Sequence, residues 1–184
     1  MLSYAAYRNQ THCFKVLFEY ALKFNTDREA PEVKRHQIRN WVNKPSDDSF
    51  VALHFATRHG NYTMLTYLVE KGEADIYIKN KFGATVMHIA AQSDQPLSLY
   101  YFYEKGVDVN IRDLKNSTPL HWACYTRSEH ALNYLMSMKP NLDARDIQGF
   151  TPLHIAIPSS EKLQSTRMVK ALLIKGADRK VPDN

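Results

Sequence analysis

Four tetrapeptides that share a histidine and an alanine recur along the chain at a nearly fixed step. They occupy residues 53–56, 87–90, 120–123 and 153–156, and their histidines stand 34, 33 and 33 residues apart. A fixed period of about 33 residues marks a stack of similar supersecondary units. Each unit of such a stack contacts mainly its neighbours. The chain should therefore fold as a repeat array whose function resides on its surface.

The third unit shows most clearly what one repeat contains. Thr118 is suited to cap a helix, and Pro119 stands at the first helical position, where no N–H donor is needed. The spacing predicts a short helix that closes near Arg127. A second amphipathic helix is predicted from apolar residues spaced i, i+1, i+4 and i+5, namely Ala131, Leu132, Leu135 and Met136. Each unit is thus a pair of antiparallel helices that follows a turn.

The turn, the Thr-Pro-Leu-His motif, the two helices and the closing Gly-Ala-Asp together resemble ankyrin repeats, although Val86 replaces the proline in one unit and Ser3 replaces a histidine in another. The resemblance implies an all-α solenoid of about five helix-turn-helix repeats with β-hairpin-like finger turns. One array over residues 1–184 is expected, and its approximate repeats are 1–41, 42–75, 76–108, 109–142 and 143–179.

Two insertions interrupt the period. The first repeat carries an insertion at residues 26–40, which predicts either an extended second helix or an added helix that starts near Pro31. Between His154 and Gly176 there are four extra residues within residues 158–166. We expect these four to lengthen the loop between the two helices of the last repeat.

Composition places the chain among globular proteins: of its 184 residues, 44% are apolar and 23% are charged. No apolar stretch approaches the roughly 18 to 20 residues that cross a bilayer, and the first residues lack the pattern of a secretory signal. Cys13 and Cys124 form no Cys-x-x-Cys pair, which favours a reducing compartment. These features predict a soluble and cytoplasmic protein, and we expect it to be monomeric unless it is part of a larger assembly.

The chain has a net charge of +5 and a pI near 9.1, and much of the excess lies in one segment. Residues 23–44 carry six basic and three acidic side chains, so this segment is net positive by three. Its centre is a secondary basic patch made of Lys34, Arg35 and Arg39. Elsewhere acids and bases alternate without a basic stripe or an aromatic RNA-binding signature, which argues against a nucleic-acid partner.

The ankyrin resemblance implies that finger turns and exposed faces of the first helices line a groove that binds another protein or peptide. Candidate partner-binding residues at these positions are Phe50, Arg58, Phe82, Gln92, Leu114, Trp122, Tyr125, Ile147 and Phe150. Many are aromatic or apolar where solvated residues would suffice. The alternative is that neighbouring finger tips pack on one another, and that Trp122 belongs to the core between repeats.

Residues 116–123 and 166–177 also look like parts of the cytosolic ankyrin array of palmitoyltransferases of the Asp-His-His-Cys class. That resemblance implies a client-recruiting region on the cytosolic face of a membrane, with Trp122 gripping proline-containing client segments. A third hypothesis is a structural subunit that docks through the basic insertion at residues 23–44.

No enzyme chemistry is predicted. The sequence contains none of the phosphate-binding loops, nucleophile elbows, zinc-protease helices or dinucleotide fingerprints. The four repeat histidines are expected to form hydrogen bonds in the turns, because packed helices stand about 8 to 10 Å apart and one zinc ion needs ligands near 2 Å. We therefore predict no catalytic residue, metal, cofactor or small-molecule substrate.

Overall fold

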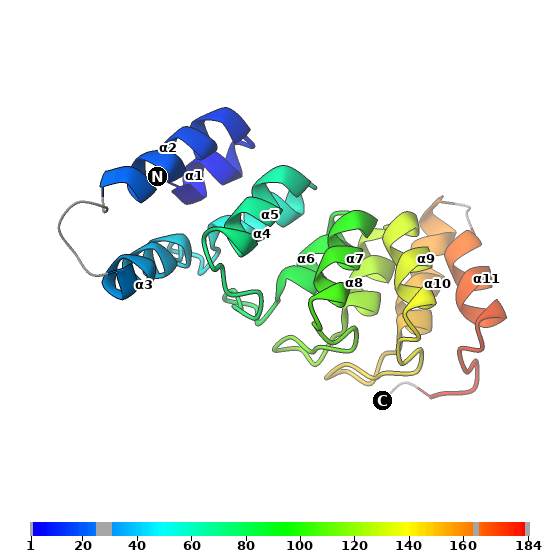
Figure 1. Cartoon of the computed structure of the whole chain (residues 1–184). Coiled ribbons are helices and arrows are strands. Elements are labelled where there is room, and N and C mark those ends of the chain that lie inside the picture. Colours follow the sequence, from blue (N-terminus) through cyan, green and yellow to red (C-terminus); the bar gives the residue numbers. More distant parts are fainter. Residues whose placement is uncertain (1, 25–30, 164–165, 183–184) are drawn as a thin grey trace. The chain divides into compact units, whose positions relative to one another are not determined.

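The computed structural model describes residues 2–24, 31–163 and 166–182, and these residues form eleven α-helices and no strand (Figure 1). The all-α prediction is confirmed. Residues 26–30 of the predicted insertion and residues 164–165 of the predicted loop lie outside the described residues. The chain divides into two compact units, Met1–Lys81 and Phe82–Asn184.

The first unit contains α1 (Leu2–Tyr7), α2 (Thr11–Phe24), α3 (Pro31–Val42), α4 (Ala52–Arg58) and α5 (Tyr62–Glu70). The pairs α1/α2 and α4/α5 are the helix pairs of two repeats. Helix α1 packs on α2 and α4, and α5 packs on α2 and α4. First helices therefore contact first helices, and second helices contact second helices, as expected for stacked repeats.

Helix α3 is the additional helix that the sequence offered as one of two alternatives, and it begins at Pro31. The Trp41 ring lies 6.1 Å from the ring of Phe18 in α2. Just after α3, Asn43 Oδ1 accepts a hydrogen bond of 2.9 Å from the Asp75 N–H. The equivalent hydrogen bond in a later repeat runs from the Asn141 N–H to Asn110 Oδ1. The chain thus rejoins the repeat pattern immediately after α3.

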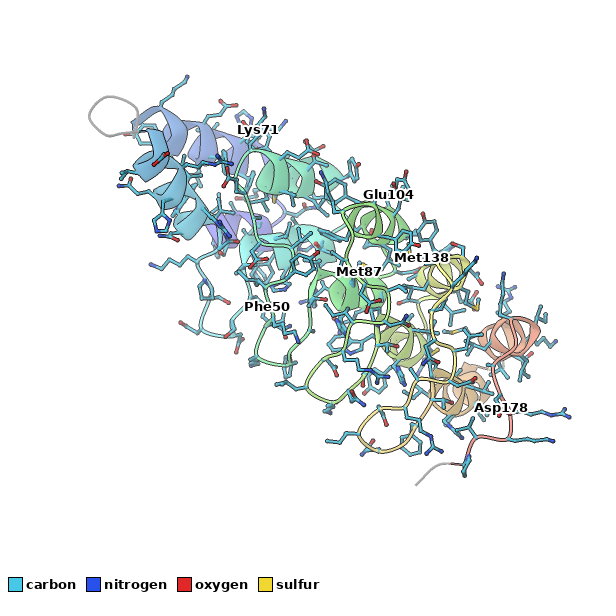
Figure 2. All side chains as sticks on the ribbon, turned by 60° about the horizontal axis from the view of Figure 1, so that its bottom comes forward. Phe50, Lys71, Met87, Glu104, Met138 and Asp178 are labelled. Carbon is cyan, nitrogen blue, oxygen red and sulfur yellow. The ribbon has the colours of Figure 1, made fainter. Side chains whose placement is uncertain are left out.

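The second unit contains three further helix pairs. They are α6 (Val86–Gln92) with α7 (Pro96–Glu104), α8 (Pro119–Thr126) with α9 (Glu129–Ser137), and α10 (Pro152–Leu163) with α11 (Arg167–Ile174). Helices α6, α8 and α10 form one layer, and α7, α9 and α11 form the other. Met87 of α6 is buried between the layers, whereas Glu104 lies at the exposed end of α7 (Figure 2).

One expectation about this unit is wrong. The residues predicted to lengthen the loop after residue 158 instead extend α10, which runs to Leu163 and spans 12 residues against 8 in α8. Pro158 lies inside the helix, although a proline there has no N–H to donate and its ring crowds the carbonyl four residues earlier. Glu161, Lys162 and Leu163 are good helix formers, so the helix continues beyond the proline.

Candidate functional site

The finger turns of the second unit are closed by an aspartate. In the turn before α8, the Asp113 N–H donates to the Ser117 carbonyl at 3.1 Å. Asp113 Oδ1 accepts hydrogen bonds from the N–H groups of Lys115 at 2.9 Å and Ser117 at 2.8 Å. Asp146 closes the next turn in the same way, from its N–H to the Phe150 carbonyl at 3.0 Å. These closures give the turns the predicted hairpin-like form.

Successive fingers are joined by backbone hydrogen bonds. The Leu114 N–H donates to the Phe82 carbonyl at 3.1 Å, and the Ile147 N–H donates to the Lys115 carbonyl at 2.9 Å. Arg112 adds a side-chain link, because its Nη1 donates to the Arg145 carbonyl at 2.9 Å. The relative positions of three consecutive finger tips are therefore fixed by hydrogen bonds.

Apolar side chains stand at these finger tips. Leu114 is 72% exposed and Ile147 is 69% exposed, and Phe82 is also exposed. Leaving a leucine-sized side chain in water forgoes about 1.5 to 3 kcal/mol of burial free energy. Contacts between neighbouring tips therefore do not bury these side chains, which weakens the alternative that the finger tips simply pack on one another.

Trp122 connects a finger to the helix layer. Its Nε1–H donates to Asp113 Oδ2 at 2.9 Å. Its half-buried ring lies 5.7 Å from the His88 ring of the preceding repeat, at an interplanar angle of 68°. Trp122 thus makes the inter-repeat contact that the sequence offered as its second interpretation. Tyr125, one turn further along α8, is exposed.

The repeat histidines form hydrogen bonds within the turns, as predicted. His121 Nδ1 accepts from the Thr118 N–H at 3.1 Å, so Nε2 carries the ring proton and donates to the Phe150 carbonyl at 3.1 Å. His88 repeats this arrangement with Thr85 and Ser117. Burial lowers the pKa of His121, which keeps the ring neutral.

Residues 2–113 and 87–183 match the family described as ankyrin repeats (3 copies). The chain belongs to the ankyrin-repeat family. A comparison with curated proteins returned no match. Ankyrin arrays are generally protein–protein interaction modules and are typically non-catalytic. Within the described ranges, no group of three or more His, Cys, Asp or Glu side chains could hold a metal ion.

The other predicted binding residues of the ankyrin array differ in exposure. Gln92 is exposed at the end of α6, whereas Phe150 is half-buried with its ring 6.1 Å from that of His154. In the first unit, Arg58 is exposed at the end of α4. Phe50 is half-buried, and its ring stacks on that of Phe55 at 5.6 Å. Phe50 and Phe150 thus contribute packing as well as surface.

The charge of the basic patch at Lys34, Arg35 and Arg39 is only partly available to a docking partner. Arg35 Nε donates to the carboxylate of Glu73, so this ion pair offsets one of its charges. Arg39 is exposed, and the side chain of Lys34 is not described. No described helix is both long enough and apolar enough to span a membrane.

Sequence reasoning did not single out Asp113 or Arg112, although both organise the fingers. A signal was present, because acidic residues recur at positions 113 and 146 and arginines recur at positions 112 and 145, each 33 residues apart. Their period matches that of the histidines. Side chains that repeat at the same step in turns are candidates for turn closure.

Proposed function

We propose that the array binds a segment of another protein through the finger tips of its second unit and the adjoining face of α8. The surface comprises Phe82, Leu114, Ile147 and Tyr125, with Gln92 and Trp122 beside them. Phe50 and Arg58 would extend the same mode of binding in the first unit. Aromatic and aliphatic anchors on a rigid frame are the usual centres of protein interfaces.

The observation that carries this proposal is the combination of exposed apolar tips with fixed spacing. Leu114 and Ile147 stand on adjacent fingers that are tied by backbone hydrogen bonds. A surface held in place before binding loses little conformational entropy when a partner docks. Lys115 lies between the two apolar tips and is exposed. Its charge favours a partner segment with an acidic residue next to apolar ones.

The test compares partners recovered from native cell extract by the wild-type array and by two variants. Leu114→Ser combined with Ile147→Ser removes the apolar tips. Leu97→Ser is the matched control, since Leu97 is 70% exposed on α7. We expect the double variant to lose a partner that the control retains, with helicity unchanged in both. An identical set of partners for all three proteins would count against the proposal.

Tyr125→Ser is a further surface variant and is preferable to a change at Trp122. The Trp122 ring contacts His88 and its Nε1–H holds Asp113, so its replacement would also disturb the finger. Tyr125 has neither contact and is exposed. Loss of the same partner in Tyr125→Ser and in the finger-tip variant would place both groups in one binding surface.

A finer proposal is that the array recruits clients for a palmitoyltransferase of the Asp-His-His-Cys class. Its support is the resemblance of residues 116–123, with the partly accessible Trp122, and the comparisons with known proteins add none. The recovered partners should then carry thioester-linked acyl groups, and Trp122→Phe should weaken their recovery. Partners without such groups by acyl-exchange analysis would exclude this role.

The third hypothesis places docking on the basic insertion. Its support is the exposed Arg39 on α3. Charge reversal at Arg35 would also break the ion pair with Glu73, so Arg39→Glu is the cleaner variant. Docking through this patch predicts that Arg39→Glu abolishes assembly while the finger-tip variant assembles normally. Normal assembly of Arg39→Glu would refute it.

A further inference from the structure

The outer face of α7 carries tyrosines at exposed positions. Tyr100 is 47% exposed, and Tyr103 is 42% exposed. In the two following repeats the place of Tyr100 is taken by Asn133 of α9 and Lys170 of α11, and both of these side chains are exposed. This position is therefore exposed in all three repeats of the unit. The packing of the core does not require an aromatic residue there.

A tyrosine of the next repeat meets Tyr100. The ring centroids of Tyr100 and Tyr134 of α9 lie 6.4 Å apart, and the angle between the ring planes is 85°. Two rings at right angles form a corner in which one small group can contact the faces of both. The face of an aromatic ring is electronegative, so such a corner attracts a cation. Tyr134 is half-buried and Tyr100 is exposed, so the pair can be reached from solvent.

A carboxylate adds negative charge beside this pair of rings. Glu104 follows Tyr100 by one helical turn and is exposed at the end of α7 (Figure 2). Burial raises the pKa of Tyr134, and electrostatic repulsion from Tyr100 and Glu104 raises it further. The three groups thus share one electronegative environment. The carbonyl end of α7 adds to it, because the C-terminal end of a helix dipole is negative.

The charge of Glu104 is not offset by a salt bridge with any residue that the structure describes. Lys105 follows Glu104 directly, but its Nζ lies over the Tyr101 ring, 5.4 Å from the ring centroid. This contact shows, in the same helix, a cation held by a tyrosine ring. Rings and carboxylate together therefore favour a positively charged group supplied by a partner.

We propose that Tyr100, Tyr134 and Glu104, which we term the tyrosine–glutamate cluster, bind an arginine side chain of a partner protein. The guanidinium stacks on the tyrosine rings, and its N–H groups donate to the Glu104 carboxylate. Arginine suits the cluster better than lysine, because a guanidinium is planar, is weakly hydrated and can donate two parallel hydrogen bonds to a carboxylate. Tyr103, on the same side of α7, offers an apolar contact for a neighbouring side chain of the partner. No residue of the cluster belongs to the finger tips, so the two surfaces bind independently.

The test uses the full chain and three synthetic peptides of the form acetyl-Gly-Ser-Leu-X-Leu-Ser-Gly-amide, in which X is arginine, lysine or citrulline. Citrulline keeps the shape of arginine but carries no charge. Binding is measured by NMR titration at millimolar peptide, because one cation–π contact with one exposed ion pair is weak. Tyr100→Leu and Glu104→Gln alter the cluster. Tyr77→Leu is the matched control, since Tyr77 is 53% exposed and lies outside the cluster and the finger tips.

We expect wild type to bind the arginine peptide at least about tenfold more tightly than the citrulline peptide and at least about threefold more tightly than the lysine peptide. Tyr100→Leu and Glu104→Gln should each weaken binding of the arginine peptide at least about fivefold, and Tyr77→Leu should leave it within about twofold. The proposal would be overturned if wild type bound no peptide or bound the arginine peptide no more tightly than either of the others. Unchanged binding by both cluster variants would overturn it as well.

Discussion

Replacement of Gly83 by alanine tests whether the finger tips are held by close backbone contact. Gly83 has a φ of +75°, and a Cβ there would lie 2.7 Å from the Leu114 nitrogen and 2.8 Å from its Cγ. Gly106 is the matched control. Its φ is +85°, but no described atom lies within 4 Å of the position of its Cβ. Both substitutions strain the backbone, but only the Cβ of Gly83→Ala would also overlap with Leu114 of the next finger.

The expected magnitudes follow from these two geometries. A left-handed conformation costs an alanine about 1 to 2 kcal/mol, and reduced entropy of the unfolded chain returns about 0.4 to 1 kcal/mol. Gly106→Ala should therefore destabilise the protein by about 1 kcal/mol. Gly83→Ala also forces the Leu114 backbone away, which costs about 1 kcal/mol for the hydrogen bond to Phe82 and about 1 to 3 kcal/mol for the overlap. Its total should be about 3 to 5 kcal/mol.

The assay is urea unfolding followed by circular dichroism, with the free energy of unfolding compared among wild type and the two variants. The informative quantity is the difference between the two alanine variants, which cancels the shared backbone strain. We expect Gly83→Ala to be less stable than Gly106→Ala by about 2 to 4 kcal/mol. Equal stabilities would show that the finger of Leu114 can move without cost, and would refute the rigid-finger argument.

Three further outcomes are expected. Burial lowers the pKa of His54 from 6.5 to about 4, so this residue contributes its full stabilisation above pH 6.5 and loses it as the pH falls towards 4. Urea unfolding should therefore show about 2 kcal/mol less stability at pH 5 than at pH 7, and this pH dependence should be smaller in His54→Gln. Cys13 is exposed, whereas Cys124 is buried and burial raises its pKa, so a thiol reagent should modify Cys13 rapidly and Cys124 only on unfolding. Equal reaction rates of the two cysteines would contradict the burial of Cys124. Trp122→Phe removes the hydrogen bond to Asp113 but keeps one aromatic ring, so it should cost about 1 to 2 kcal/mol of unfolding free energy, whereas Trp122→Ala should cost about 3 kcal/mol or more. Equal losses would mean that the ring contributes no packing.

The helix pairs could be predicted because their causes are local and repeat. Thr118 with Pro119 marks the start of a helix by capping and fixed φ, and the structure starts α8 at Pro119. The histidines were predictable for the same reason, since His121 lies within one turn of the backbone group that it accepts from. Because these signals involve only neighbouring residues, they can be recognised in the sequence alone.

The features that the sequence did not reveal depend on residues far apart or on a balance of opposing terms. Trp122 reaches an aspartate nine residues earlier, and no local pattern marks that bond. The contact between Trp41 and Phe18 requires the insertion to fold back on α2, which no period describes. The four extra residues within 158–166 were expected to lengthen a loop, but α10 continues through Pro158 to Leu163, and the repeat period does not show how inserted residues divide between helix and loop.

Departures from the repeat indicate where on the surface a binding function can be tested. Positions that meet the same neighbour in every unit must carry similar residues, because packing restricts their size, as Phe102, Leu135 and Leu172 illustrate by being fully buried. Exposed positions are under no such restriction. A tyrosine at 100, where the two following repeats have asparagine and lysine, is therefore not required by the packing of the core. The same reasoning applies to Leu114 and Ile147, so each surface can be tested by its own polar substitution without disturbing the core.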